Sequence, residues 1–196
     1  MTTATKRSPG RRAVTDHGSI ERAAFRLFEE QGFDDTTMEQ IAEALGVGRR
    51  TLFRYFPSKN DIPWGQFDQS LRDFAAQLAS VPLEVPVSEA VHRCVVAFND
   101  FDEQSLPQHR IRMRLILDTP TLQAHSALRY ASWRAVIEDY VAARLKMRPD
   151  ALLPRLAGHV SLALAVSSYE QWLSEPGSDL TSILRTAMDE LRSYLG

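Results

Sequence analysis

Apolar residues recur along this chain at intervals of three and four positions, and short segments containing proline or glycine separate the runs. Near the N-terminus, Ile20, Ala24, Leu27 and Phe28 follow this spacing before Gly32 interrupts it. Such spacing places apolar side chains on one face of a helix, and no sustained alternation of apolar and polar residues indicates a strand. The pattern therefore predicts an all-α fold of about nine helices.

Two short helices with a tight turn between them follow the first helix. Thr37 and Gln40 have the spacing of a capping box, which predicts that a helix begins here and ends at Gly46. A third helix is expected over residues 49–55, before Pro57 breaks it. Two helices joined in this way have the geometry of a helix-turn-helix motif, here over residues 37–56.

The rest of the chain also has helical patterns. Ser58 and Asp61 have a second capping-box spacing, so we expect a fourth helix from there to about Ser80. Proline and glycine signals then divide the chain into further helices at about 88–103, 107–118, 121–147, 151–174 and 179–195. We divide the chain into a flexible basic arm (1–14), a helix-turn-helix domain (15–60) and a C-terminal helical domain (61–196).

The net charge of -2 conceals an uneven distribution of charge. Residues 1–60 contain ten Lys/Arg and eight Asp/Glu, whereas the remainder contains thirteen and seventeen. Two basic clusters stand out: Lys6, Arg7, Arg11 and Arg12 in the arm, and Arg49, Arg50, Arg54 and Lys59 around the third helix. They indicate a face that binds a polyanion, although a solvated surface with a disordered tail gives the same pattern.

The composition excludes several classes of protein. No apolar run approaches the roughly 18 residues that a membrane-spanning helix requires, and the basic N-terminus lacks the apolar core of a secretory signal. Cys94 is the only cysteine, which excludes an internal disulfide and a metal cage of cysteine pairs and favours a cytoplasmic location. A glycine-rich phosphate loop, HExxH and GxSxG are all absent, so we expect no enzyme, no cofactor and no metal site.

The second helix of the motif has side chains suited to the major groove of DNA, which is about 12 Å wide and admits one helix. Leu52 and Phe56 would face inward, and the polar side chains that can face outward are Arg49, Arg50, Thr51, Arg54 and Tyr55. Thr37, at a helix N-terminus, and Lys59 are placed to hold phosphates on either side.

This part of the chain resembles the DNA-binding domain of the TetR/AcrR family of transcriptional regulators. The matching positions are Ala24, Leu27–Phe28, Gly32–Phe33, Thr36–Thr37, Ile41–Ala42, Leu45–Val47, Thr51–Phe53, Tyr55–Phe56 and Ser58–Lys59. The family commonly has serine and tyrosine where this chain has Gly48 and Phe53. Gly48 removes a possible N-cap hydroxyl from the recognition helix, and Phe53 removes a hydroxyl that can touch phosphate.

The resemblance implies a role for each matching residue. Phosphate contacts would come from Thr37, Tyr55 and Lys59. Base edges would be read by Arg49, Arg50 and Thr51, with Arg54 at the margin of the groove. Arg49 or Arg50 is the expected determinant of specificity, because arginine pairs bidentately with guanine. For Arg11 and Arg12 of the arm, minor-groove contact and plain disorder both stay open.

The resemblance also implies that the C-terminal domain binds a small effector and forms a homodimer. Apolar residues line the last two expected helices: Leu162, Val166, Leu173, Leu180, Leu184, Ala187 and Leu191. Two such helices can pair with a second copy as a four-helix bundle, or the same residues can pack inside one subunit. We expect the dimer, because helix-turn-helix proteins read palindromes as dimers.

Large side chains in the middle of the chain are candidates for an apolar effector pocket, although some of them would belong to the core: Phe98, Phe101, Met113, Leu117, Tyr130, Trp133 and Trp172. A basic cluster lies beside them in the sequence, formed by His109, Arg110, Arg112 and Arg114. We include His109 and Arg112 in the pocket. The cluster can meet a carboxylate or phosphate of the ligand, or it can be a solvated helix face.

Three segments resemble the TetR-type regulators associated with mycofactocin biosynthesis clusters: SKNDIPWGQFD, HRIRMRLILDTPTLQAHSALRYASWRAVI and LLPRLAGHVSLALAVSSYEQWL. Long-chain acyl-CoA is a ligand class of several members of the wider family, and it suits an apolar pocket beside basic residues. We therefore expect a repressor that binds a palindromic operator on double-stranded DNA as a dimer and is released by a small apolar or acyl-type effector. A DNA-binding regulator or scaffold protein without a ligand is the alternative.

Overall fold

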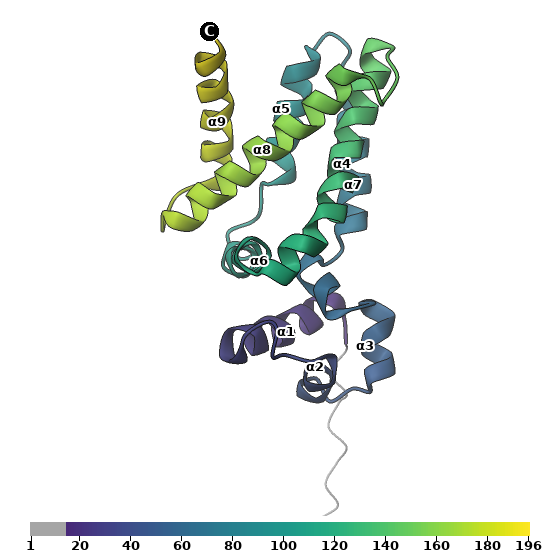
Figure 1. The fold of residues 1–196 in the computed structure, drawn as a ribbon, viewed down its shortest axis with the longest axis vertical. Helices are drawn as coiled ribbons and strands as arrows, with labels where there is room; N and C mark the ends of the chain where they lie inside the picture. The colour runs from purple at the N-terminus through teal and green to yellow at the C-terminus, as the bar shows by residue number, and fades with distance from the viewer. Residues whose placement is uncertain (1–14) are drawn as a thin grey trace, which may run out of the picture.

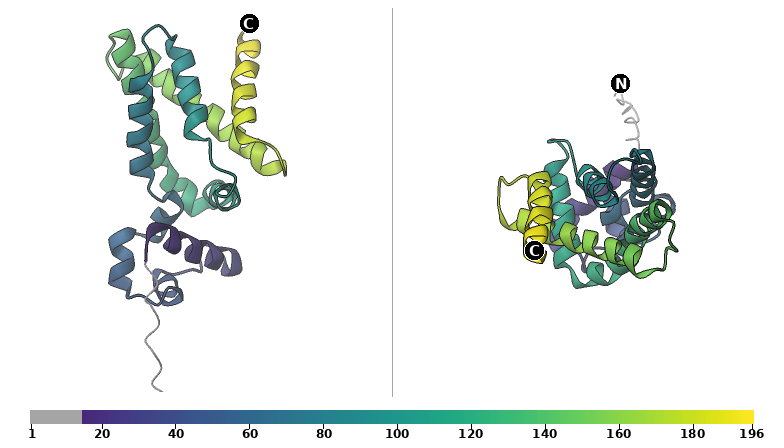
Figure 2. Two further views of the ribbon diagram at one scale, coloured as in Figure 1. Left: turned by 180° about the vertical axis from the view of Figure 1, so that it is seen from behind. Right: turned by 90° about the horizontal axis from the view of Figure 1, so that it is seen from above.

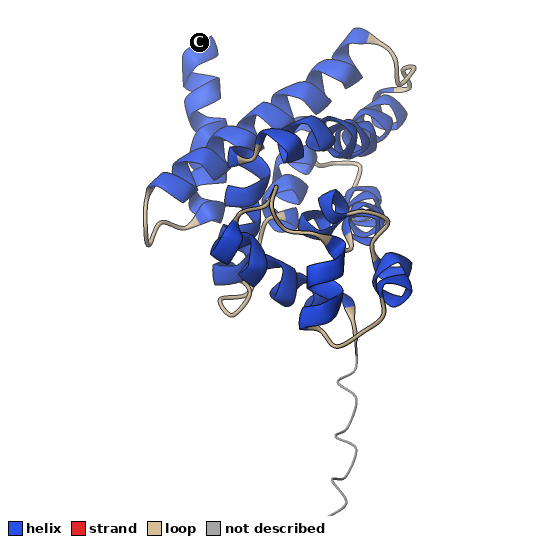
Figure 3. Ribbon diagram, turned by 60° about the horizontal axis from the view of Figure 1, so that its bottom comes forward, coloured by secondary structure: helices blue, strands red, loops and turns tan. Residues whose placement is uncertain are grey.

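The computed structural model describes residues 15–196, and within them the fold consists of nine α-helices and one 3-10 helix, without strands (Figures 1 and 3). This confirms the all-α prediction. The expectations for the arm, including Arg11 and Arg12, lie outside the described residues. The elements are α1 His17–Gln31, α2 Met38–Ala44, α3 Arg49–Tyr55, η1 Lys59–Trp64, α4 Phe67–Ser80, α5 Val87–Phe98, α6 Leu106–Asp118, α7 Pro120–Leu145, α8 Leu152–Ser174 and α9 Leu180–Leu195.

The helices form a small N-terminal unit of α1–α3 and η1 and a larger unit of α4–α9 (Figures 1 and 2). In the larger unit, α7 and α8 are long neighbours, α4 packs along α7, and α9 packs on α8 and α5. η1 packs against α1 and belongs to the N-terminal unit, and the two units meet where α6 and α7 pack against α1 and η1. None of the helices in the described part of the chain combines the length and apolar character that crossing a membrane requires.

Local signals explain where the first helices begin and end. Asp16 caps α1, accepting a hydrogen bond from the backbone N–H of Ser19 at 2.7 Å. The expected capping box of α2 is confirmed: the Gln40 backbone N–H donates to the Thr37 hydroxyl oxygen at 3.2 Å, and the Thr37 N–H donates to the Gln40 side chain at 2.7 Å. Gly32 ends α1 with a φ of 89°, in the region that favours glycine.

The fourth helix begins later than the sequence predicts. Ser58 does not cap it; its hydroxyl donates instead to the Asp61 carboxylate at 2.7 Å. The chain then forms the 3-10 helix η1, which ends at Gly65 with a φ of 56°, and α4 begins at Phe67. The fifth helix ends at Phe98 rather than 103, where the buried Asn99 side chain donates to the Val95 carbonyl at 2.7 Å.

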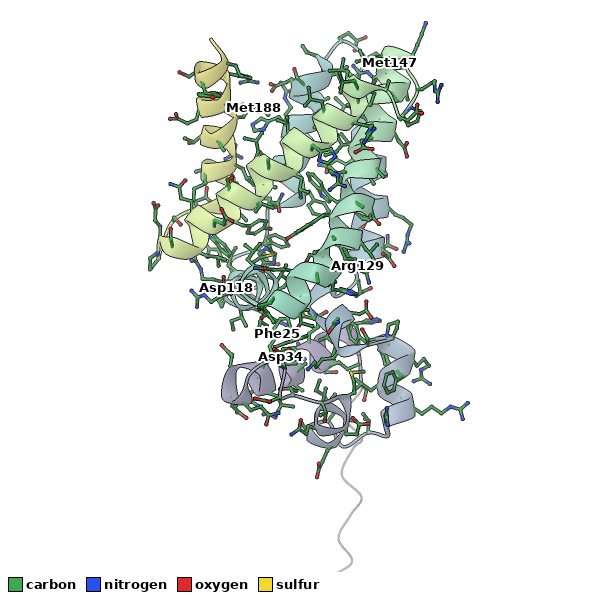
Figure 4. All side chains as sticks on the ribbon, viewed as in Figure 1. Phe25, Asp34, Asp118, Arg129, Met147 and Met188 are labelled. Carbon is green, nitrogen blue, oxygen red and sulfur yellow. The ribbon has the colours of Figure 1, made fainter. Side chains whose placement is uncertain are left out.

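Two hydrophobic cores correspond to the two units. The N-terminal core contains Ile20, Phe28, Ile41, Leu52 and Phe56, all almost fully buried. It also includes Ile62 of η1 and Leu122 of α7, so the packed N-terminal unit takes in residues beyond α3. The C-terminal core contains Phe74, Trp133, Ile137, Tyr169, Trp172 and Leu184. In Figure 4, Phe25 and Asp34 lie in the N-terminal unit, and Arg129 lies in the larger unit just above the junction between the two.

Candidate nucleic-acid interface and internal cavity

The outer face of α3 carries the side chains that the sequence assigns to base reading. Leu52 is fully buried and Phe56 nearly so, which fixes the inner face of the helix. Arg50 and Arg54 are exposed. Among the described residues, Arg50 has no ion-pair or hydrogen-bond partner, whereas the Arg54 guanidinium lies 5.5 Å from the Tyr55 ring centroid. Arg50 is therefore the cation of this helix that is freest to contact a ligand.

Arg49 is already paired. Its guanidinium lies 2.6 Å from the carboxylate of Glu39 on α2, and 5.1 Å from the centroid of the Phe53 ring. Both charged side chains are more than half exposed, so this ion pair is weak and easily exchanged for a phosphate or a base. Thr51 is half-buried on the same helix.

Thr37 fits a phosphate contact. It is exposed at the N-terminus of α2, and its hydroxyl oxygen accepts the Gln40 N–H. The hydroxyl proton is available to a further acceptor, since a hydroxyl group can accept and donate at once.

Lys59 has a structural role that the sequence did not indicate. Its ammonium group donates to the carbonyls of Phe33 at 2.5 Å, Thr36 at 2.8 Å and Asp34 at 3.1 Å. The three carbonyls match the three protons of an ammonium group, so none is left for a phosphate in this conformation. Burial lowers the pKa of Lys59, the main effect, while Asp34 and Asp35 oppose the shift. The expected phosphate contact is therefore replaced by a tie between η1 and the α1–α2 loop.

Tyr55 is likewise engaged inside the unit. Its hydroxyl donates to the Thr15 carbonyl at 2.7 Å, and its ring makes an edge contact with His17, with centroids 5.1 Å apart. The phenolic proton is thus unavailable to a phosphate. The side chain joins the end of α3 to the start of α1, a contact between residues 40 positions apart that short-range patterns do not reveal.

A cavity of about 800 Å³, open to solvent on one side, lies in the larger unit and extends to the N-terminal unit. Its walls come from α4–α8, and its floor includes η1 and the first turns of α1, at His17, Gly18 and Glu21. The predicted pocket residues that line it are Phe98, Phe101, His109, Arg112, Met113, Tyr130 and Trp133. Further lining residues that the sequence did not single out are Trp64, Phe67, Phe74, Asn99 and Ile116.

Leu117 and Trp172, two predicted pocket residues, do not line this cavity. Leu117 packs against the C-terminal core. Trp172 is 2% exposed within it, and its indole N–H donates to the Ser178 carbonyl at 3.2 Å. The Arg110 guanidinium lies 4.0 Å from the Trp172 ring centroid and donates to the Trp172 carbonyl at 2.6 Å. The tryptophan thus joins α8 to α6 and to the α8–α9 loop.

The residues predicted for the dimer divide between several environments. Leu180 and Leu184 are each 2% exposed in the subunit core, so they cannot also form a surface between subunits. Leu162 and Val166 line the cavity, and Leu173 packs partly on the core. Ala187 and Leu191 are half-buried on α9. The alternative reading, in which these residues pack inside one subunit, is correct for Leu180 and Leu184.

A buried chain of hydrogen bonds crosses the cavity wall. His109 Nε2 lies 2.8 Å from the Tyr169 hydroxyl, which donates to Asn99 Oδ1 at 2.6 Å. The Phe101 ring covers the imidazole, with centroids 3.8 Å apart. Burial, with a smaller contribution from the Arg112 charge, lowers the pKa of His109 to about 3. Burial also raises the pKa of Tyr169, so both groups are neutral at physiological pH.

The predicted basic cluster on α6 therefore separates into different roles. Arg114 is exposed, Arg110 covers Trp172, and His109 is a neutral core residue at the cavity. Arg112 reaches the N-terminal unit: it forms an ion pair with Glu21 of α1 and donates to the Pro63 carbonyl of η1 at 2.8 Å. Neither a solvated face nor a single anion site describes all four residues.

A second ion pair joins the units away from the cavity. Arg129 of α7 lies 2.8 Å from Asp61 of η1 and 3.1 Å from Asp68. His125 Nε2 lies 3.2 Å from the same Asp61 oxygen, but not in hydrogen-bonding orientation. Burial acts to raise the pKa of Asp61, yet the hydrogen bonds from Ser58 and Arg129 and the nearby positive charge lower it overall.

Two family descriptions match the chain. Residues 20–62 match the bacterial regulatory proteins of the tetR family, and residues 85–196 match the MftR C-terminal domain. The chain is 41% identical, over 92% of its length and 91% of the relative, to a mycofactocin biosynthesis transcriptional regulator named MftR from Mycobacterium tuberculosis. This confirms the resemblance drawn from the sequence.

Solved structures share the fold. The chain superposes on FadR of Thermus thermophilus, a TetR-family repressor in complex with lauroyl-CoA, with a TM-score of 0.52 at 23% identity, covering 89% of this chain and 92% of that one. It superposes on FadR of Bacillus subtilis, in complex with stearoyl-CoA, with a TM-score of 0.58 at 16% identity, covering 89% and 96%. The chain belongs to the TetR family of bacterial transcriptional regulators, which are not enzymes, and carries an MftR-type C-terminal domain.

Proposed function

We propose that this regulator is a cytoplasmic repressor that binds a palindromic operator as a homodimer and is released by a small effector in the cavity of the larger unit. The observation that carries the proposal is the floor of the cavity. His17, Gly18 and Glu21 belong to the first helix of the DNA-binding unit, yet they line a cavity whose walls come from the larger unit. An occupant would therefore touch both units, and preferential binding to one arrangement of them would shift the population toward it.

Within the DNA-binding unit, we assign base reading to Arg49, Arg50 and Thr51, with Arg54 at the groove margin and Thr37 on a phosphate. Arg50 is the sharpest test because it is exposed and unpaired among the described residues. An operator can be obtained by selection from random duplex DNA with the purified protein. Arg50→Ala should lose about 1–3 kcal/mol of binding free energy on that operator and less on random DNA.

Arg155→Ala is the matched control for Arg50→Ala. Arg155 is exposed on α8, so its removal changes the net charge equally without touching α3. The operator affinity of Arg155→Ala should stay near that of the unmodified protein. Equal losses on operator and random DNA for Arg50→Ala would remove Arg50 as a base reader and leave it a general phosphate contact.

For the effector we propose an acyl-type molecule. The cavity volume of about 800 Å³ falls in the range of small-molecule sites, and aromatic residues such as Trp64, Phe74 and Trp133 line it beside a few polar groups. The two FadR structures hold acyl-CoA, which makes lauroyl-CoA and stearoyl-CoA suitable probes. Thermal shift with these probes, against free CoA, should show stabilisation by the acyl-CoAs alone. Absence of any shift at saturating probe would exclude acyl-CoA as the effector.

For the dimer we propose the outward faces of α8 and α9. Exposed Ser167 and Thr186 both line a cleft of about 250 Å³ between these helices. Light scattering should detect a dimer, and Thr186→Arg should give monomers. Ala131→Arg, on an exposed position of α7, is the control.

Truncation at Glu175 would be a poor test of the dimer, because it also removes Leu180 and Leu184 from the core. A dimer that persists in Thr186→Arg and Ser167→Arg would exclude this face.

A further inference from the structure

Two ion pairs hold the DNA-binding unit to the larger unit, and they differ in one respect. Arg129 binds Asp61 at 2.8 Å outside the cavity, since neither residue is part of its lining. Arg112 and Glu21 also form an ion pair, and both residues line the cavity. An occupant of the cavity can therefore reach the Arg112–Glu21 pair and not the Arg129–Asp61 pair.

The surroundings of Glu21 make it dependent on Arg112. Glu21 is only 7% exposed, although it is a carboxylate on the surface helix of a small unit. A Cβ atom at Gly65 would lie 2.8 Å from a Glu21 carboxylate oxygen and 2.9 Å from Arg112 Nη1, which shows how closely the backbone covers the pair. A buried carboxylate that loses its cation is strongly unfavourable. If Arg112 bound another anion instead, the Glu21 carboxylate would be left buried without a cation. Its free energy would be lower in water, and α1, which carries Glu21, would move with it.

Arg112 is also suited to a second anion. It is the single Arg or Lys among the described residues that line the cavity. The Pro63 carbonyl accepts from Nη1 at 2.8 Å, which holds the guanidinium in place while Nη2 faces Glu21. The guanidinium group forms paired hydrogen bonds with carboxylate or phosphate oxygens. The neutral His109 and Tyr169 in the same wall offer no competing positive charge.

We propose that an effector with an apolar chain and an anionic carboxylate or phosphate group binds Arg112 in place of Glu21, and that this exchange releases α1 from α6. The inference rests on the proposed ligand-responsive function and adds the residues through which the ligand acts. Glu21 is a competitor for the ligand's own binding site. Loss of the Glu21 charge must therefore strengthen binding of the anion. If the ion pair were purely structural, loss of that charge would not strengthen anion binding.

The test measures binding of three probes of equal chain length by calorimetry: dodecanoate, dodecyl phosphate and the neutral 1-dodecanol. Glu21→Gln removes the competing charge and keeps the size of the side chain, so the two anions should bind about tenfold more tightly, a typical coupling between sites. Arg112→Gln should lose the preference for the anions. Affinity for 1-dodecanol should stay the same in both variants. The two anions distinguish a carboxylate from a phosphate as the preferred group.

Two controls isolate the proposed exchange. Arg129→Gln breaks the other ion pair between the units, and it should leave the affinity for dodecanoate unchanged. The double variant Glu21→Gln/Arg112→Gln contains no unpaired buried charge, so it remains foldable and should bind dodecanoate and 1-dodecanol with equal affinity. Hydrogen exchange gives the structural readout: saturating dodecanoate should speed exchange of α1 amides in the unmodified protein, and Glu21→Gln should show fast exchange without ligand.

Three results would overturn the inference. The first is anion binding by Glu21→Gln that is no tighter than that of the unmodified protein. The second is anion binding by Arg112→Gln that is as tight as that of the unmodified protein. The third is a failure of the unmodified protein to bind either anion. Anion binding that follows the expected pattern, combined with operator affinity that neither dodecanoate nor lauroyl-CoA changes, would support anion binding at Arg112 and contradict the proposed ligand-released repressor. The two proposals can therefore fail separately.

Discussion

The His109 imidazole donates a hydrogen bond to the Tyr169 hydroxyl, and the direction of this bond follows from its neighbours. Tyr169 donates its single proton to Asn99 Oδ1 at 2.6 Å, and Asn99 Nδ2 donates to the Val95 carbonyl at 2.7 Å. The Tyr169 oxygen must therefore accept from His109 Nε2, which lies 2.8 Å away. A neutral imidazole with its proton on Nε2 satisfies the chain.

Acid should destabilise the protein through His109. In the unfolded chain this histidine takes up a proton near its usual pKa of 6.5, whereas the folded protein holds the pKa at about 3. The unfolded state thus binds more protons below pH 6.5, and stability falls as the pH falls. Urea unfolding between pH 7.5 and 5 should show a slope that approaches about 1.4 kcal/mol per pH unit from this group. His109→Gln should lose that component.

His159→Gln is the control for the pH experiment. His159 is exposed on α8, so its imidazole remains in water in the folded and the unfolded protein. His159 lies outside the His109–Tyr169–Asn99 chain, so its replacement controls for the loss of a histidine as such. The range above pH 5 keeps most carboxylates ionised, and so separates the histidine from them. An acid slope as steep in His109→Gln as in the unmodified protein would contradict the assignment.

Lys59→Met should reduce stability rather than DNA affinity alone. The substitution removes the donor for three carbonyls of the α1–α2 loop, at Phe33, Asp34 and Thr36. Hydrogen bonds from charged groups each contribute about 1.5–3 kcal/mol, and partial exposure of Lys59 places the total loss near the value for a single bond. Chemical denaturation should detect this loss. Arg50→Met should show the reverse: normal stability and weaker operator binding. Unchanged stability of Lys59→Met would restore the phosphate assignment.

The helical fold could be predicted from local sequence patterns. The roles of Lys59 and Tyr55 could not, because contacts between residues far apart in the sequence determine them. The Thr37 capping box lies within four residues, so it could be predicted. Lys59 contacts carbonyls 23 to 26 positions away, and Tyr55 contacts Thr15 across 40 positions. For both residues, spacing along the sequence could not indicate that the polar atoms are used internally.

The apolar residues of the C-terminal unit show a similar limit. A stripe such as Leu180–Leu184 identifies a buried helix face but not the surface that buries it, and here it is the subunit's own core. Seven of the nine proposed pocket residues line the cavity, because large side chains gather wherever helices leave space between them. Glu21 carried no signal: its place on the cavity floor depends on how the two units dock.

Gly48 and Gly46 flank the turn of the motif and should respond differently to substitution. Gly48 precedes α3 in extended backbone without a side-chain cap, and a Cβ atom there would have nothing within 4 Å. Gly48→Ser should add the N-cap bond and stabilise the protein by a few tenths of a kcal/mol, roughly 0.3, in thermal unfolding. Gly46 has a φ of 66°, so Gly46→Ala should destabilise by about 1 kcal/mol.

Gly48→Ala separates the two contributions at position 48. It adds a Cβ atom without a hydroxyl, and alanine is a poor N-cap residue. A stability for Gly48→Ala as high as for Gly48→Ser would show that the gain comes from restricting the unfolded chain, and would exclude a capping role for the serine hydroxyl.

Glu39 should restrain DNA binding through Arg49. The two charges lie 2.6 Å apart at the N-terminus of the recognition helix, so the carboxylate both occupies Arg49 and repels nearby phosphates. Glu39→Gln should therefore increase affinity for duplex DNA. Exposed ion pairs of this type contribute about 0.2–1 kcal/mol, which corresponds to an increase of at most roughly fivefold. The gain should be largest at low salt, because exposed charges are screened as ionic strength rises.

Glu43→Gln distinguishes the ion pair from a general change of charge. Glu43 is exposed on the same helix as Glu39, and no cation pairs with it among the described residues. Fluorescence anisotropy with labelled duplex across a salt series should give a smaller gain for Glu43→Gln than for Glu39→Gln. Equal gains would mean that only net charge matters. A loss of operator affinity in Glu39→Gln, with random DNA unaffected, would instead mean that Glu39 positions Arg49 for base reading.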